Sequence, residues 1–127
     1  MSVLEKKKAQ YEKMLGENKK NLSVIVCGDF NDVPGSSPVE QFTLNKDLLL
    51  QSVFDEEKYT VYHYFPFLFG LAIPYKGVVD FIMHSSNLKV SKKLEGPTNE
   101  AVGKDGLLSD HYPSDHMSIF CDFYLDQ

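Results

Sequence analysis

Apolar residues near the start of the chain recur with the spacing of one helical face. Leu4, Tyr11, Met14 and Leu15 fall on a single stripe, with Glu and Lys on the other sides, and Gly16 follows as a stop signal. The pattern predicts a surface helix of about four turns.

A short apolar run from Leu22 to Cys27 comes next and stops abruptly at an acid, an aromatic and an amide. Such a run is typical of a strand covered on both faces, and the polar cluster beyond it lies where a strand becomes a loop. Asp29 and Asn31 at this edge are either the polar end of a catalytic strand or an Asx-turn that bonds its own backbone.

The following segment carries helix-start signals. Ser37 as N-cap, Pro38 at the first helical position and Glu40 facing back predict a capping box and a helix from Pro38 to about Lys46. Residues 48–54 are too densely apolar to assign, because a last helical turn and a short strand fit equally well.

The second half of the chain predicts strands. Residues 60–64 alternate as a strand does, and residues 65–76 are expected to form an apolar loop that packs on something. A strand over 77–84 carries Asp80 in its middle, and further strands over 88–94 and 117–125 complete one sheet. A buried Asp is costly unless it is bonded, so Asp80 is expected within hydrogen-bonding reach of the His116 ring.

Composition limits the classes of protein. The 127 residues are 43% hydrophobic, so residues 1–127 form one domain or a part of a larger one. The net charge of -5 includes 13 lysines and no arginine, which excludes a broad basic field for duplex nucleic acid and leaves only local phosphate contacts.

Cysteine usage and apolar run length bear on the compartment. Cys27 and Cys121 lie in strand-like apolar runs and are expected to be reduced core residues of an intracellular, most simply cytoplasmic, protein. The longest apolar stretch, 65–75, is interrupted by Pro and Gly and is far too short to span a membrane, so no membrane association is expected.

Polar groups at three predicted strand ends suggest one site. If the strands are neighbours, Asp29, Asn31, Asp80, Asp115 and His116 converge. Oxygen ligands suit a hard cation such as Mg2+, an amide donates to a phosphate oxygen, and a His oriented by an acid binds a phosphoryl oxygen. The set predicts phosphodiester chemistry, although each acid also has a structural interpretation as a bonded core or turn residue. The other histidines, His63, His84 and His111, are expected to be surface or packing groups.

Three strings in this order resemble a known superfamily. They are Cys-Gly-Asp-Phe-Asn at 27–31, Gly-Val-Val-Asp-Phe-Ile at 77–82 and Pro-Ser-Asp-His at 113–116. They look like the C-terminal motifs of the endonuclease/exonuclease/phosphatase superfamily, and most of all like the carbon-catabolite-repressor-type deadenylase, nocturnin, angel and 2′-phosphodiesterase group. The resemblance runs from about Leu4 to Phe123 and covers only the second half of that family's catalytic domain.

The resemblance implies roles for individual residues. Asp29 would activate the nucleophile or serve the leaving group, Asn31 would contact the scissile phosphate, and Asp80 would orient His116, which stabilises the pentacovalent phosphate. Asp29 and Asp115 would lie at the metal, expected to be Mg2+ with Mn2+ as a substitute. Tyr75 stands where deadenylases place an adenine-stacking ring.

Two positions depart from the family pattern, and part of the family's site is absent. Asp32 replaces a small polar residue, and the segment 65–74 is longer and more apolar than usual. The family's main metal-binding Glu, a second Asn and another His have no counterpart in this sequence.

The fold implied is the α/β (α+β) sandwich of this superfamily, with mixed, mostly antiparallel sheets flanked by helices. The implied function is a magnesium-dependent 3′-exoribonuclease or phosphodiesterase acting on an RNA 3′ end or oligoadenylate, with deadenylase-complex proteins as partners, inactive in this stretch alone. A DNA or phosphoinositide phosphohydrolase and a noncatalytic RNA- or protein-binding remnant are the alternatives. Without its other half the sheet would expose an apolar patch, so dimerisation or strand exchange is expected.

Overall fold

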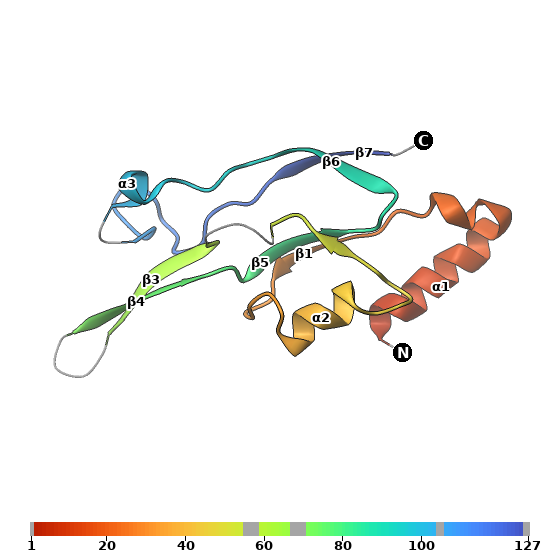
Figure 1. Ribbon diagram of the computed structural model, residues 1–127, viewed down its shortest axis with the longest axis horizontal. Coiled ribbons are helices and arrows are strands. Elements are labelled where there is room, and N and C mark those ends of the chain that lie inside the picture. The colour runs from red at the N-terminus through yellow and green to blue at the C-terminus, as the bar shows by residue number, and fades with distance from the viewer. Residues whose placement is uncertain (1, 55–58, 67–70, 104–105, 126–127) are drawn as a thin grey trace.

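The computed structural model describes residues 2–54, 59–66, 71–103 and 106–125. Three short α-helices and seven short strands follow one another along the described chain, with β2 to β6 in an unbroken series of strands (Figure 1). In order they are α1 (Val3–Leu15), the 3-10 segment η1 (Gly16–Asn21), β1 (Ile25–Asp29), α2 (Ser37–Thr43), β2 (Gln51–Ser52), β3 (Val61–Pro66), β4 (Ala72–Gly77), β5 (Asp80–His84), β6 (Leu88–Lys93), α3 (Asn99–Val102) and β7 (Cys121–Leu125).

The strands form three small antiparallel sheets. The central sheet has the order β1-β5-β2, and β3-β4 and β6-β7 are two-stranded. Figure 1 shows α1 and α2 on one side of the central sheet, β6 and β7 on the other, and the β3-β4 hairpin with α3 at one end. The mixed α and β architecture with antiparallel sheets confirms the expected fold class, whereas the expectation of one continuous sheet is wrong.

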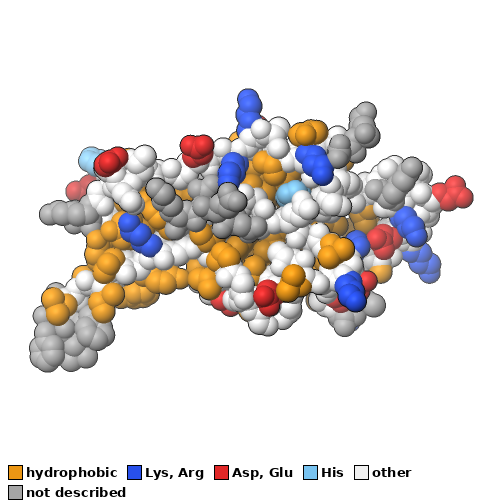
Figure 2. All heavy atoms as spheres, viewed as in Figure 1, with side chains coloured by type: hydrophobic (Ala, Val, Ile, Leu, Met, Phe, Trp, Pro, Cys, Tyr) orange, Lys and Arg blue, Asp and Glu red, His pale blue; other side chains and the backbone are white. Residues whose placement is uncertain are grey.

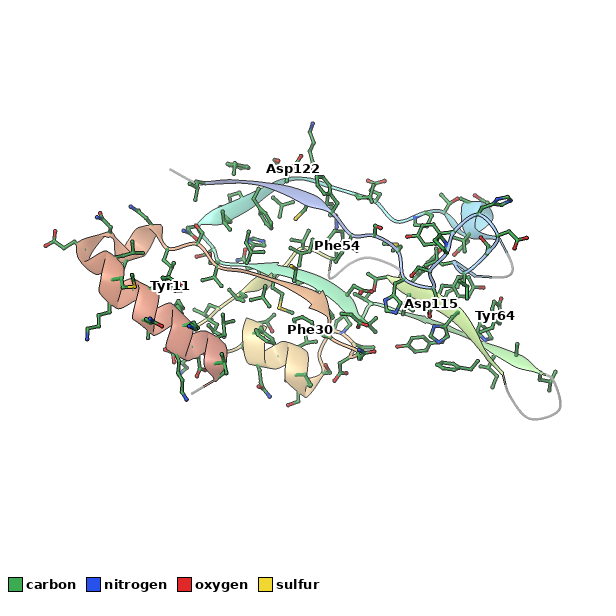
Figure 3. All side chains as sticks on the ribbon, turned by 180° about the vertical axis from the view of Figure 1, so that it is seen from behind. Tyr11, Phe30, Phe54, Tyr64, Asp115 and Asp122 are labelled. Atoms are coloured by element: carbon green, nitrogen blue, oxygen red, sulfur yellow. The ribbon has the colours of Figure 1, made fainter. Side chains whose placement is uncertain are left out.

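The main core lies between the central sheet and α2. Phe81 and Met83 alternate along β5 on the same face and are fully buried, and the core cluster that they form includes Val39 of α2. Phe30 joins this core beside Phe42 and Phe81, with ring centroids 5.2 and 5.3 Å away (Figure 3). Period-two alternation therefore fixes which face of β5 points to the helices.

The opposite face of β5 is covered by the third sheet. His84 is buried, and its ring lies 5.0 Å from that of Phe123 in β7. The expectation that His84 is a packing group is confirmed, since this contact joins β5 to the β6-β7 sheet.

The helix starts differ from the sequence prediction. Ser36 is the N-cap of α2 and makes no side-chain cap bond, so the predicted capping box of Ser37 and Glu40 is wrong, and the helix ends at Thr43. A capping box does occur at α1, where Ser2 accepts from the Glu5 backbone and the Glu5 carboxylate accepts from the Ser2 backbone.

Helix α1 has the predicted bounds but a looser attachment than its apolar stripe suggested. Gly16 ends it with φ 55, a conformation that favours glycine. Leu4 packs against the core cluster, but Tyr11 and Met14 are 51% and 73% exposed (Figure 3). No helix in the described part of the chain is long and apolar enough to cross a membrane.

Strand β1 is not covered on both faces as predicted. Val24 and Val26 pack against the core, whereas Ile25 is 51% exposed and Cys27 is exposed as well. Both cysteines are free, but Cys27 is not the core residue that its apolar surroundings suggested. The face of β1 turned away from the helices therefore lacks a cover in the described chain.

The segment expected to be an apolar loop contains a strand. Residues 72–77 form β4 and pair with β3 in the register His63↔Tyr75 and Phe65↔Ile73, while residues 67–70 lie outside the described part. Figure 2 shows apolar side chains gathered over this hairpin and along the middle of the molecule. In the ambiguous stretch 48–54, Gln51 and Ser52 form the short strand β2.

Candidate active site

The antiparallel pairing of β1 with β5 brings two acids together. Asp29, the last residue of β1, is the direct register partner of Asp80, the first residue of β5. The two sheet-end carboxylates therefore face the same edge.

The loop after β1 is shaped by Asp29 itself. Its Oδ1 accepts the Asn31 N–H at 2.7 Å, and Asn31 has φ 51, a left-handed conformation that Asn tolerates. The Asx-turn and the site interpretations of this stretch are thus compatible, because Asp29 accepts the turn hydrogen bond and also has a carboxylate oxygen in the cluster described below. Asp32 bonds the neighbouring Val33 N–H and lies outside the cluster.

Asp80 begins β5 instead of lying in the middle of the predicted strand 77–84, and it has the partner that its partial burial requires. Oδ2 of Asp80 lies 2.9 Å from Nδ1 of His116, and the Asp80 side chain is only 14% exposed. This contact matches the sequence expectation. It engages Nδ1 of the His116 ring with the Asp80 carboxylate.

Strand β3 holds the Asp115-His116 segment in place. Val61 and His116 form an isolated antiparallel bridge, the Tyr62 N–H donates to the Asp115 carbonyl at 2.9 Å, and the Met117 N–H donates to the Thr60 carbonyl at 2.8 Å. A strand that carries no predicted catalytic acid therefore positions the histidine.

Thr60 is a site-shaping residue that sequence reasoning missed. Its side chain is fully buried, and its Oγ1 accepts the N–H groups of both Val79 and Asp80 at 3.0 Å. A polar residue between Tyr59 and Val61, two apolar positions, was the available signal. The hydroxyl fixes the backbone from which Asp80 projects.

His63 packs as expected but also contacts the site. Its ring lies 4.3 Å from that of Phe65 and 5.4 Å from that of Tyr75, centroid to centroid. Its Nδ1 lies 2.8 Å from Oδ2 of Asp115, which sits where the hairpin meets the central sheet (Figure 3). The third such histidine, His111, is exposed.

Tyr75 lies in a cluster of rings on the hairpin rather than alone. It is half-buried between His63 and Phe65, and its hydroxyl lies over Gly77, where a Cβ would approach to 2.8 Å. Gly77 therefore gives the tyrosine ring its room.

Three of the predicted residues form a group able to hold a metal ion. Ligand atoms of Asp29, Asp80 and His116 lie within 4.8 Å of one another. Carboxylate oxygens suit a hard divalent cation, so the donor set fits such an ion at the exposed Asp29 end. Asp115 lies outside this group, and its carboxylate is turned to His63.

The acids act on the charge of His116. Partial burial alone lowers the pKa of His116, but the hydrogen bond with Asp80 and the charges of Asp80, Asp115 and Asp29 together outweigh it. The pKa of His116 is therefore raised above the ordinary histidine value.

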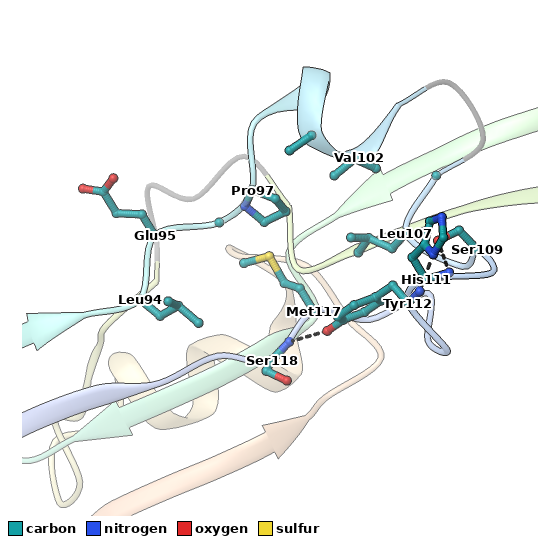
Figure 4. Close-up of a pocket in the computed structure, with 13 residues that line it drawn as sticks. Leu94, Glu95, Pro97, Val102, Leu107, Ser109, His111, Tyr112, Met117 and Ser118 are labelled. Carbon is teal, nitrogen blue, oxygen red and sulfur yellow. Dashed lines mark hydrogen bonds between the residues drawn. The ribbon is translucent and has the colours of Figure 1, made fainter.

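A separate apolar cavity adjoins the same loop. It has a volume of about 540 Å³, and none of the six predicted site residues lines it (Figure 4). Leu107 and Met117 form part of its wall, and two other lining residues are joined by a hydrogen bond from the Ser118 N–H to the Tyr112 hydroxyl at 3.1 Å. This cavity is distinct from the acidic cluster.

The family comparison agrees with the motif order. The model of the Endonuclease/Exonuclease/phosphatase family matches residues 4–116. The chain belongs to this family.

Similar proteins within the family are nocturnins and a CCR4-type protein. Nocturnin of Rattus norvegicus is 31% identical over 115 residues, 84% of this chain and 26% of that protein, and nocturnin of Xenopus laevis is 33% identical over 116 residues, 82% and 28%. A probable CCR4-Not complex 3′-5′-exoribonuclease subunit of Vairimorpha ceranae is 28% identical over 124 residues, 84% and 25%. The expected deadenylase and nocturnin group is confirmed.

A solved structure of the family agrees with the fold. The human nocturnin catalytic domain with bound sulfate superposes with a TM-score of 0.58 at 23% identity, covering 99% of this chain and 44% of that one. The chain spans about a quarter of the length of the curated relatives it matches.

Replacing Thr60 tests the backbone clamp. Thr60→Val keeps the shape but leaves the Val79 and Asp80 N–H groups without an acceptor, which is expected to cost about 1–3 kcal/mol of unfolding free energy. Thr60→Ser, which keeps the hydroxyl, is the matched control and is expected to lose less. Urea unfolding measures both, and equal losses for the two variants would contradict the clamp.

The charge argument predicts the titration of His116. Its ring is expected to titrate above the ordinary histidine pKa, and Asp80→Asn, which removes a charge, is expected to lower the value. Since the folded-state pKa is the higher one, the stabilisation from His116 is complete below the unfolded-state pKa and is lost as pH rises through the folded-state pKa. Ring-proton NMR measures the shift, and an unchanged pKa in Asp80→Asn would contradict the assignment.

Proposed function

We propose that this chain supplies the His116 side of a magnesium-dependent phosphodiesterase centre that acts on the 3′ end of RNA or on oligoadenylate. The observation that carries the proposal is the Asp80–His116 hydrogen bond beside Asp29, with a ligand atom of each of the three residues within 4.8 Å of the others. Relatives named as nocturnins and as a 3′-5′-exoribonuclease subunit support a nuclease of the deadenylase type.

The geometry suggests a division of labour among the side chains. Asp80 bonds Nδ1 of His116, so Nε2 of that ring donates to a phosphate oxygen and stabilises the charge that develops there. Asp29 has one oxygen in the Asx-turn, and its other oxygen accepts the proton of an attacking water. The Asn31 amide follows in the same turn and donates to the scissile phosphate.

The metal proposed here is Mg2+, with Mn2+ as a substitute. Bound at Asp29 and Asp115, it would neutralise negative charge on the phosphate. Asp29 is exposed, and Asp115 is 37% exposed, so both carboxylates are reachable. The chain's own contribution is to hold these acids beside His116.

The substrate and partner proposals rest on the hairpin and on one relative. Stacking of a base on the half-buried Tyr75 ring is worth about 1–3 kcal/mol and tolerates sequence variation, as an RNA 3′ end requires. One relative is named as a subunit of the CCR4-Not complex, so we include deadenylase-complex proteins among the partners. An RNA-decay role also fits an intracellular location with free cysteines.

Hydrolysis is expected to need more than these residues. Two acids hold Mg2+ weakly without a further carboxylate, and each 1.36 kcal/mol of lost transition-state stabilisation is tenfold in rate. Residues 1–127 alone are expected to release AMP from oligoadenylate at least about 100-fold more slowly than the same chain joined to the other half of a nocturnin-type catalytic domain. Timed product analysis with Mg2+ measures the ratio.

Controls separate the functional alternatives. In the joined protein, His116→Ala is expected to abolish the reaction, while His111→Ala, which alters an exposed histidine outside the cluster, is expected to leave it unchanged. DNA and a phosphoinositide are tested in parallel, and preference for either would replace RNA as substrate. Fast AMP release by residues 1–127 alone would overturn the incomplete-site argument and direct attention to Asp32.

The exposed apolar surface predicts association. Ile25 of β1 and Phe120, Tyr124 and Leu125 around β7 are each more than half exposed, and the human nocturnin domain is more than twice as long as the part matched here. Residues 1–127 alone are therefore expected to dimerise or aggregate. Light scattering with a hydrophobic dye tests this, and a monomer that binds no dye would contradict it.

A further inference from the structure

Two consecutive residues of the site are each held by a partner from a different sheet. His116 contacts Asp80 at the start of β5 through Nδ1 and Oδ2, at 2.9 Å. Asp115 contacts His63 in β3 through Oδ2 and Nδ1, at 2.8 Å. The first pair is a carboxylate holding an imidazole, and the second is an imidazole holding a carboxylate.

His63 is itself held by neighbours in the β3-β4 hairpin. It is the register partner of Tyr75 in the hairpin, and its ring packs on those of Phe65 and Tyr75. The side chain is 22% exposed, and neither ring nitrogen makes a well-aligned hydrogen bond within the described chain. Burying an imidazole whose nitrogens lack hydrogen bonds costs free energy. Packing alone therefore does not explain why the His63 ring lies beside the Asp115 carboxylate.

Asp115 needs an external partner to keep one orientation. The Tyr62 N–H fixes only its backbone carbonyl, and its side chain is more than a third exposed. A contact to one carboxylate oxygen restricts rotation and leaves the other oxygen free. His63 of the β3-β4 hairpin supplies that contact, as outer-shell groups commonly do around metal ligands.

We propose that His63 is a positioning residue that holds the Asp115 carboxylate toward the phosphate site, so that the β3-β4 hairpin sets the geometry of the metal side of the cluster. The metal part of this proposal rests on the function proposed above. The orientation part concerns residues of this chain alone and is tested without any metal.

Two substitutions separate positioning from packing. His63→Asn keeps an N–H donor near the place of Nδ1 but loses the ring, whereas His63→Phe keeps a ring against Phe65 and Tyr75 but has no donor. A positioning role predicts that Asn preserves the behaviour of Asp115 and Phe does not. A packing role predicts the reverse. His111→Phe is the matched control, since His111 is exposed and outside the cluster.

The first readout is the χ1 rotamer of Asp115 in metal-free protein, from NMR couplings to Cγ. One dominant rotamer is expected in the wild type, His63→Asn and His111→Phe, and averaging among rotamers in His63→Phe. A single rotamer in His63→Phe, or averaging in both His63 variants, overturns the proposal. Should His63→Phe not fold, His63→Leu also lacks the donor and is judged by the same criterion.

The second readout is Mn2+ affinity, from paramagnetic broadening of amide signals in the cluster. His63→Phe is expected to bind Mn2+ about 10–100-fold more weakly than the wild type, and His63→Asn to stay closer to it. Equal affinity in all three proteins overturns the metal part of the proposal. If the wild type binds no Mn2+, the proposed metal role of Asp115 fails, while the rotamer comparison still decides whether His63 positions it.

Discussion

The register of β1 against β5 is the constraint on which the site depends. Phe81 and Met83 must face the helices, and because side chains alternate along a strand, Asp80 is then turned to the other face. A slip of one residue would expose Phe81 and bury Asp80. The packing of the apolar core therefore decides that Asp29 and Asp80 stand opposite each other at the sheet edge.

Two facing carboxylates repel, and the surrounding contacts offset this. One oxygen of Asp29 accepts the Asn31 N–H, and Asp80 forms a hydrogen bond with Nδ1 of His116. Burial alone would lower the pKa of His116, but its hydrogen bond with Asp80 and the charges of three acids raise it by more. The repulsion that would destabilise an ordinary strand pair here favours a positively charged histidine or a bound cation.

Local patterns predicted much of this arrangement, and long-range contacts account for what they missed. Alternation and the isolated acid predicted the Asp80 strand and its histidine partner. The sequence marks Thr60 only as a polar residue between two apolar ones, and its role could not be predicted because its partners, the N–H groups of Val79 and Asp80, are distant in sequence. They also missed β4, since Pro74 within residues 72–77 resembles a loop residue, and a hairpin edge tolerates proline.

The predicted helix cap at Ser37 failed for a related reason. Either of two adjacent serines can precede the helix, and the chain begins it one residue earlier than the capping-box spacing requires. The same limit applied to the prediction that β1 is buried on both faces: an apolar run indicates that a cover is needed but not whether the same stretch of chain provides it. Val26 finds its cover in the helices, and Ile25 does not. Since β1 delivers Asp29 to the cluster, whatever covers that open face also lies next to the edge at which Asp29 and Asp80 stand opposite each other.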